Sequence, residues 1–151
     1  MSEYAFEPRR IEKPWGWELI WALTDRYCGK LLFIRAGESL SLQYHETKDE
    51  SWYVQDGRAA LELSGVGADD RQLVEITAGD CFHFRPLTVH RVRALEDTLV
   101  IEVSTPEIDD VVRLERREPA RQLAPDVARP DKSGRRRLEL ERTRIADGDA
   151  G

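Results

Sequence analysis

Three side chains of the kind that bind metal ions occupy two parts of this 151-residue sequence. His45 and Glu50 lie close together in the first half, and His90 follows much later in the chain. Two imidazole nitrogens and a carboxylate oxygen suit a borderline divalent cation such as Zn²⁺, or a non-haem Fe²⁺ or Mn²⁺. The residue types alone do not choose among these metals, so the pattern predicts one divalent metal site of open identity.

Alternation along the segment before His45 indicates which residues share its face of a strand. The residues on the opposite face are apolar: Leu40, Leu42 and Tyr44. The residues on the same face are polar: Ser41, Gln43 and Thr47. Glu50 opens the next segment and can face His45 across a hairpin. Buried polar groups need partners, so we expect this face to line a cavity.

Short segments of period-two alternation recur between positions 15 and 104 and predict an all-β sandwich or barrel. Turn residues separate these segments, and Asp56-Gly57 predicts a hairpin. The expected strands are 17–23, 30–36, 39–46, 50–55, 58–63, 72–77, 81–84, 90–94 and 98–104. The segment Ile108–Arg117 is the only plausible helix and would end the domain.

Composition limits the partners and divides the chain. Twenty-three Lys+Arg against 29 Asp+Glu give a net charge of −6, which argues against a nucleic-acid or membrane partner. No apolar run approaches the roughly 20 residues that cross a bilayer, and the N-terminus lacks a secretory layout, so we expect a cytoplasmic protein. The last 33 residues contain no aromatic side chain. We therefore expect an arm over 1–12, one domain over 13–118 and a disordered tail over 119–151.

The spacing of these residues resembles the two motifs of the cupin superfamily. The first motif, Gly-x5-His-x-His-x3–4-Glu-x6-Gly, is matched in part by Gly37, His45, Glu50 and Gly57, with Thr47 read in place of its second histidine. The second motif, Gly-x5-Pro-x-Gly-x2-His, is matched in part by Gly79 and His90, with Arg85 and Leu87 in place of Pro and the inner Gly. The resemblance implies a double-stranded β-helix, the jelly-roll barrel of cupins.

A closer resemblance, over roughly residues 13 to 115, is to the type II mannose-6-phosphate isomerase cupin. That domain often forms the C-terminal part of bifunctional mannose-1-phosphate guanylyltransferases. The segments that carry the likeness are 13–18, 37–45, 50–52 and 109–115. Type I mannose-6-phosphate isomerases, also cupins, hold zinc through a Gln-x-His pair, a Glu and a later His. The resemblance thus implies zinc, with manganese or iron as alternatives, and this ligand set: Gln43, His45, Glu50 and His90.

The resemblance also implies a reaction, the interconversion of mannose 6-phosphate and fructose 6-phosphate in carbohydrate and polysaccharide biosynthesis. A proton must move between C1 and C2, and with Glu50 occupied as a ligand, His83 is the best remaining general base. Lys30 and Arg91 are the cations expected to bind the phosphate, with Lys13 and Arg35 as further candidates. Thr47 and Trp52 are expected to line the pocket, with Trp52 against the sugar face.

Two other functions fit the same residues. A metal-dependent cupin oxygenase would also use two histidines and one carboxylate. A non-catalytic cupin would bind a sugar or another effector without turnover. We also expect a homodimer, formed through an edge strand of the barrel.

Overall fold

The computed structural model describes residues 2–68 and 70–115, and these residues form strands joined by turns and loops. The strands are β1 (Arg9–Lys13), β2 (Gly16–Leu23), β3 (Cys28–Ile34), β4 (Leu42–Tyr44), β5 (Glu50–Asp56), β6 (Arg58–Gly65), β7 (Gln72–Thr77), β8 (Cys81–Phe84), β9 (Thr88–Ala94), β10 (Thr98–Ser104) and β11 (Val112–Glu115). The all-β prediction is therefore confirmed.

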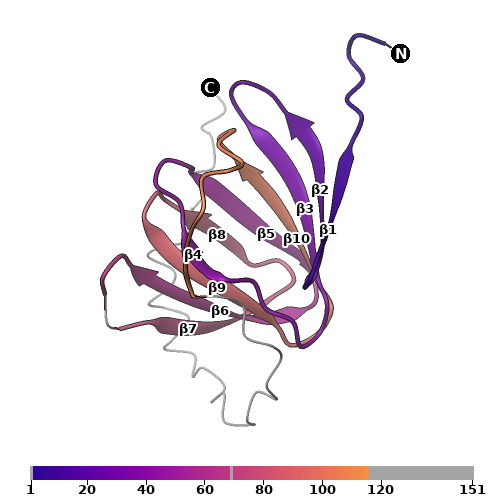
Figure 1. Ribbon diagram of the computed structural model, residues 1–151. Coiled ribbons are helices and arrows are strands. Elements are labelled where there is room, and N and C mark those ends of the chain that lie inside the picture. Colours follow the sequence, from indigo (N-terminus) through magenta and orange to yellow (C-terminus); the bar gives the residue numbers. More distant parts are fainter. Residues whose placement is uncertain (1, 69, 116–151) are drawn as a thin grey trace, which may run out of the picture.

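The strands form two antiparallel sheets that face each other (Figure 1). The larger sheet has the order β1-β2-β3-β10-β5-β8, and the smaller has the order β11-β4-β9-β6-β7. Sequence neighbours pair in hairpins, whereas β10 joins β3 to β5 and β9 joins β4 to β6. These long-range pairings bring residues near 45, 50 and 90 to one region between the sheets.

The apolar core fills one part of the space between the sheets. Its centre holds fully buried side chains from both sheets, including Ile34, Val54, Leu61, Val92 and Val100. Alternation puts these residues on the inner faces, as expected for strands that pack on one side. The rest of the interior is polar and forms the pocket described below.

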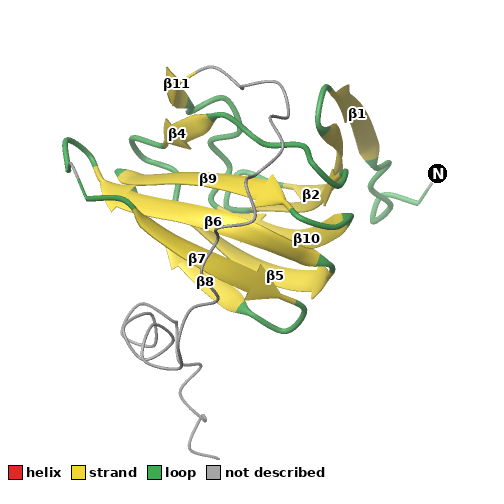
Figure 2. Ribbon diagram, turned by 90° about the horizontal axis from the view of Figure 1, so that it is seen from below, coloured by secondary structure: helices red, strands yellow, loops and turns green. Residues whose placement is uncertain are grey.

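The segment predicted as the C-terminal helix is not helical where the structure describes it. Residues 112–115 form β11, which pairs antiparallel with β4, with Arg113 opposite Gln43 (Figure 2). Val112 and Leu114 are two residues apart, which is the spacing of a strand, and this segment pairs with the edge of β4. Residues 116 and 117 lie outside the described residues.

The sheet also begins earlier than the sequence indicated. Residues 9–13 form β1 and pair with β2 from Arg9 opposite Ile20 to Lys13 opposite Gly16, so part of the expected arm belongs to the larger sheet. The expected tail, 119–151, lies outside the described residues. In the described part of the chain there is no helix of the length and apolarity needed to span a membrane.

Candidate metal centre and its pocket

Three buried side chains from the two sheets converge at one point. His45 directly follows β4, Glu50 begins β5, and His90 lies in β9. The Nε2 atoms of His45 and His90 are 3.4 Å and 3.1 Å from Oε1 of Glu50. Their possible ligand atoms all lie within 4.8 Å of one another. We call these three residues the triad.

Each histidine of the triad is oriented by a backbone carbonyl. His45 Nδ1 bonds to the carbonyl of Asp110, and His90 Nδ1 lies 2.9 Å from the carbonyl of Thr88. A carbonyl only accepts, so Nδ1 carries the proton and donates in both rings. Nε2 of each ring is then directed toward Glu50. The ring of His90 also stacks on Phe84, with centroids 4.7 Å apart.

This arrangement places two Nε2 atoms around one carboxylate oxygen. Burial acts to lower the pKa of His45, but the contact with Glu50 and its negative charge outweigh it and raise that pKa. A metal ion bound at the triad would take the place of the proton on a histidine ring, because metal ligands must be deprotonated. Glu50 Oε1 and His90 Nε2 are close but not aligned as a hydrogen bond, and both are buried without a hydrogen-bond partner among the described residues. Acceptors held together in this way fit a divalent cation, whose histidine ligands typically donate their other N–H to a backbone carbonyl.

A buried lysine stabilises the carboxylate of the triad. Lys48 Nζ lies 2.6 Å from Glu50 Oε2 and 2.6 Å from Glu102 Oε1. Burial acts to raise the pKa of Glu50, but the two imidazoles and the charge of Lys48 outweigh it and hold that pKa well below its usual range. Burial and the charge of Glu50 raise the pKa of Glu102. Glu50 is therefore ionised and ready to bind a cation.

Asp110 joins the loop before β11 to the turn after β4. Its carboxylate accepts hydrogen bonds from the backbone N–H groups of Glu46, Thr47 and Lys48, at 3.0, 2.7 and 2.9 Å. These bonds outweigh partial desolvation and hold the pKa of Asp110 far below its usual value. Because its carbonyl also binds His45, Asp110 fixes the position of one triad ring.

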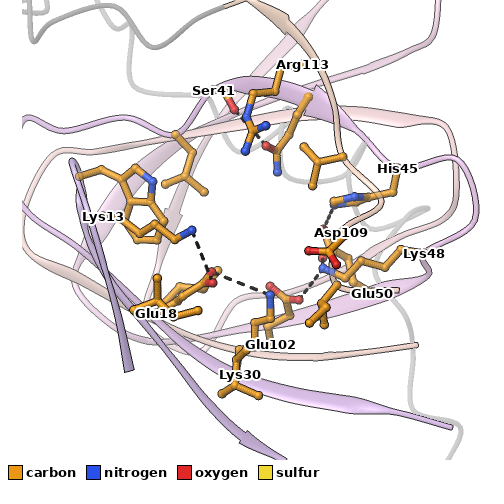
Figure 3. Close-up of a pocket in the computed structure, with 18 of the residues that line it drawn as sticks. Lys13, Glu18, Lys30, Ser41, His45, Lys48, Glu50, Glu102, Asp109 and Arg113 are labelled. Atoms are coloured by element: carbon orange, nitrogen blue, oxygen red, sulfur yellow. Dashed lines mark hydrogen bonds and ion pairs between the residues drawn. The ribbon is translucent and has the colours of Figure 1, made fainter. Parts of the chain in front are cut away.

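His45 and Glu50 of the triad line a cavity of about 850 Å³ (Figure 3), whereas the buried His90 is not part of its lining. Charged side chains of both signs surround the cavity: Arg9, Lys13, Glu18, Lys30, Lys48, Glu50, Glu102, Asp109 and Arg113. Lys13 and Lys30 lie 3.6 Å and 3.8 Å from Glu18. Arg113 makes no ion pair within the described part of the chain, and Figure 3 shows its guanidinium directed into the cavity from the wall facing Glu102. The cavity is thus lined both by candidate metal ligands and by Arg113, an arginine without an ion-pair partner among the described residues.

Comparison with known proteins gives the family. Residues 31–104 match the family described as "Cupin domain". The chain contains a cupin domain. All three triad residues lie inside the matched segment, whereas Asp109, Asp110 and Arg113 lie beyond it.

The cupin chain is 30% identical over 116 residues to "Mannose-1-phosphate guanylyltransferase ManC" of Salmonella typhimurium. It is 30% identical over 112 residues to "Mannose-1-phosphate guanylyltransferase" of Escherichia coli (strain K12). These matches cover 72% and 70% of this chain but 22% of each relative. The cupin chain therefore spans about a fifth of the length of these curated relatives.

Solved structures share the cupin fold. The capsular polysaccharide assembling protein CapF from Staphylococcus aureus matches with a TM-score of 0.62 and 17% identity, over 74% of this chain and 35% of that one. KdgF from Halomonas sp. matches with a TM-score of 0.57 and 27% identity, over 70% of this chain and 92% of that one. The expected double-stranded β-helix is confirmed.

The cupin pocket includes several residues that the sequence had singled out. His45 and Glu50 line it, and Gln43 lines it from β4, opposite His90 in the adjacent strand β9. Gln43 Oε1 accepts a hydrogen bond from Ser41 Oγ at 3.0 Å. The other predicted residues that line the cavity are Lys13, Lys30 and Trp52. Trp52 is buried, and its indole N–H has no hydrogen-bond partner among the described residues.

Besides His90, four residues that the sequence had singled out lie outside the lining of this cavity. His83 Nε2 is 2.7 Å from Asp49 Oδ1. Arg91 is held by Glu62 and Glu115, at 2.6 Å and 3.1 Å. The exposed Arg35 donates to the Pro14 carbonyl, and Thr47 bonds to Asp110 instead of facing the cavity.

The position of Thr47 changes how the first cupin motif is read. Gln43 follows Gly37 after five intervening residues, which is the motif's spacing to its first histidine. His45 then occupies the second histidine position. Gln43, on the pocket face, therefore stands at the first histidine position of the motif, and Thr47 stands outside both histidine positions.

Sequence reasoning missed Lys48, Glu102, Asp109, Asp110 and Arg113. Lys48 and Glu102 are 54 residues apart, and no local pattern indicates that they meet. Alternation did offer a signal for Glu102, since it shares a face of its strand with the apolar Val100, and a charge there needs a partner. The other three residues lie in Ile108–Arg117, which was predicted as a helix, so strand alternation was not used to place their side chains.

Proposed function

We propose that this cupin catalyses the metal-dependent aldose–ketose isomerisation of a sugar phosphate, with mannose 6-phosphate as the first candidate substrate. The observation that carries the proposal is the triad, in which Glu50 Oε1 and His90 Nε2 have no hydrogen-bond partner in the described structure. Two of its members, His45 and Glu50, line a cavity that Arg113 also lines. The name of the curated relatives, which concerns mannose 1-phosphate, supports a phosphorylated sugar.

His45, Glu50 and His90 would hold the cation, with Gln43 as a possible fourth ligand. A divalent cation bound there supplies a Lewis acid that polarises the substrate carbonyl and stabilises negative charge on the neighbouring oxygen. Lys48 occupies Glu50 Oε2 and leaves Oε1 for the cation. The buried wall keeps this geometry fixed before substrate arrives.

The phosphate group would bind Arg113, because this side chain points into the cavity and has no carboxylate partner in the described structure. A guanidinium binds phosphate oxygens through two parallel hydrogen bonds. Lys13 is the second cation, since its ion pair with Glu18 is long at 3.6 Å and can be exchanged. Trp52 offers its unpartnered N–H to a sugar hydroxyl.

The reaction needs a base beside the metal, and we place that role on Asp109 instead of His83. Asp109 lines the cavity, and Figure 3 shows it next to His45 and Glu50. It takes the proton from the carbon next to the carbonyl and returns it to the former carbonyl carbon, while a hydroxyl proton moves between the two oxygens. The enediol between these steps keeps atoms and charge balanced.

One observation favours a second candidate, a cupin oxygenase. The amide oxygen of Gln43 is already bonded to Ser41, which leaves two histidines and one carboxylate as ligands. This set is the facial triad of non-haem Fe(II) oxygenases. Oxygen uptake by the Fe(II)-loaded protein with a sugar substrate, and without isomerase activity, would favour this candidate.

The test is elemental analysis of the purified chain together with a coupled assay that converts mannose 6-phosphate into fructose 6-phosphate. We expect one divalent metal per chain and turnover that chelation abolishes. Glu50→Gln should lose both metal and turnover, whereas Asp109→Asn should keep the metal and lose turnover. Saturable binding of the sugar phosphate without turnover would overturn the isomerase proposal and identify a binding cupin.

A further inference from the structure

Two buried charges in the cavity wall are only loosely paired. Glu18 of β2 and Lys30 of β3 line the cavity and project into it from the larger sheet, as Figure 3 shows. Their side chains are 13% and 8% exposed, and Lys30 Nζ lies 3.8 Å from Glu18 Oε2. In the same cavity, Lys48 Nζ lies only 2.6 Å from Glu102 Oε1. We call Glu18 and Lys30 the open pair.

Neither member of the open pair makes a side-chain hydrogen bond within the described part of the chain. A separation of 3.8 Å is too long for such a bond. Lys13 does not supply one either, because its Nζ is 3.6 Å from Glu18 Oε1. Buried charged groups need hydrogen-bond partners. The partners of the open pair must therefore come from the cavity, as water or as a bound ligand.

The register of the larger sheet places the open pair in a row of polar groups. Lys30 is opposite Glu102 of β10, and Glu102 is opposite Trp52 of β5. Glu18 lies diagonally beside Lys30 on the other neighbouring strand. Acceptors and donors thus alternate along the row, from a carboxylate to an ammonium, a second carboxylate and an indole N–H. With about 4.8 Å between strands, the backbones of Lys30 and Trp52 are roughly 10 Å apart.

The alternation of charge in this row favours hydroxyl groups over an anion. A phosphate bound to Lys30 would lie between the carboxylates of Glu18 and Glu102 on the two neighbouring strands, and like charges at such separations repel. A hydroxyl group both donates and accepts. One hydroxyl can donate to Glu18 while its neighbour accepts from Lys30. The row therefore suits the uncharged, hydroxyl-bearing part of a ligand.

We infer that Glu18 and Lys30 bind hydroxyl groups on the part of the sugar that lies away from the reacting carbons, and that they select sugars by chain length. The inference rests on the proposed function, because it places the reacting carbons at the triad. Trp52 shares the inner face of β5 with Glu50, so the row begins beside the triad and leads away from it.

This assignment changes the role that the sequence suggested for Lys30, from a phosphate cation to a ligand of sugar hydroxyls. A three-carbon sugar phosphate at the triad would not reach the open pair. A six-carbon one would reach it and would leave Lys13 and Arg113 for the phosphate.

The experiment measures the binding of two phosphorylated polyols to the full chain by calorimetric titration. Mannitol 1-phosphate has six carbons, and glycerol 3-phosphate has three. Neither compound has a carbonyl group, so binding is measured without isomerisation. We expect the wild-type chain to bind mannitol 1-phosphate at least about 10-fold more tightly, which is the effect of a hydrogen bond to a charged group.

Lys30→Met should weaken the binding of mannitol 1-phosphate by about 10-fold and leave that of glycerol 3-phosphate unchanged. Glu18 keeps Lys13 as a partner in this variant. The matched control is Arg91→Gln, which removes a buried cation outside the cavity lining and should change neither affinity. Glu18→Gln, with the same expected selectivity, replaces Lys30→Met if circular dichroism shows that the latter is unfolded.

Three results would overturn the inference. Equal losses for the two compounds in Lys30→Met would identify Lys30 as a phosphate ligand. Equal affinities of the wild-type chain for the two compounds would show, without any variant, that the distant hydroxyls are not bound. A wild-type chain that binds neither compound would overturn the proposed function and this inference with it.

Discussion

Lys48 binds one oxygen of the triad carboxylate, with Nζ 2.6 Å from Oε2 of Glu50, while Oε1 of the same carboxylate faces the two histidines. The two oxygens of Glu50 thus have separate roles. Lys48 neutralises one side and also binds Glu102, so one buried cation serves two buried carboxylates.

Removal of the Lys48 charge should destabilise the fold. Lys48→Met leaves two buried carboxylates without their shared cation, and we expect the free energy of unfolding to fall by about 3 kcal/mol. Urea denaturation measures this. Lys13→Met is the control, since the partly exposed pair of Lys13 with Glu18 should contribute less than about 1 kcal/mol.

Adding Glu102→Gln to the Lys48→Met variant should recover part of that loss, because one of the two unpaired charges disappears. If the double variant were less stable than Lys48→Met alone, carboxylate repulsion would not be the cause of the loss.

Two histidines should differ in their effect on metal binding. His90→Ala removes a triad ligand, and we expect the affinity for Zn²⁺ or Mn²⁺ to fall by about 100-fold or more. His83→Ala should leave the affinity unchanged, because His83 is not part of the triad and pairs with Asp49. Calorimetric titration of the chelator-treated protein measures both. Equal losses in the two variants would contradict the assignment of the triad.

Local patterns in the sequence predicted most strands, because alternation reflects which side of a strand is buried. The same rule placed Gln43 and His45 on one face. It failed for β1, whose sequence Arg-Arg-Ile-Glu-Lys has one apolar residue, since that strand contributes charged side chains to the cavity. It also failed for β11, which is defined by pairing with a strand almost 70 residues earlier.

The part of the site that could be predicted is the part that belongs to a known sequence motif. His45, Glu50 and His90 follow cupin spacing, and the structure brings them together. Contacts such as that of Lys48 with Glu102 arise only from the fold. His83 was selected as the remaining histidine, and Arg91 as a cation near the segments that resemble the family. Neither residue lines the cavity.

The hydrogen bonds of Asp110 to the turn after β4 should contribute both to stability and to metal affinity. Asp110→Ala removes the acceptor of three backbone N–H groups, so we expect a loss of about 2 kcal/mol in unfolding free energy. Looser positioning of His45 should lower metal affinity by about 10-fold. Asp109→Asn, one residue earlier, should change neither quantity. Unchanged metal affinity in Asp110→Ala would show that His45 is positioned without the carboxylate of Asp110.

Two glycines with the same backbone conformation should tolerate alanine differently. Gly57 and Gly79 both have φ of +92°, a left-handed conformation that costs a side chain roughly 1–2 kcal/mol. A Cβ on Gly57 would lie 2.2 Å from the Asp97 carbonyl oxygen, whereas nothing lies within 4 Å at Gly79. We therefore expect Gly57→Ala to cost about 2 kcal/mol more than Gly79→Ala. Thermal unfolding of the two variants compares them, and equal costs would mean that the hairpin shifts freely.

The last prediction compares Arg113, which lines the cavity but was missed in the sequence, with Arg91, which the sequence had singled out for the phosphate. Arg113 points into the cavity, while Arg91 is held by Glu62 and Glu115 outside the cavity lining. If Arg113 binds the phosphate, Arg113→Gln should raise the KM for mannose 6-phosphate by about 10-fold, the loss of one charge-assisted contact, with a smaller change in kcat. Arg91→Gln should leave the KM unchanged. Steady-state kinetics of both variants checks this, and a raised KM in Arg91→Gln alone would move the phosphate site away from the cavity.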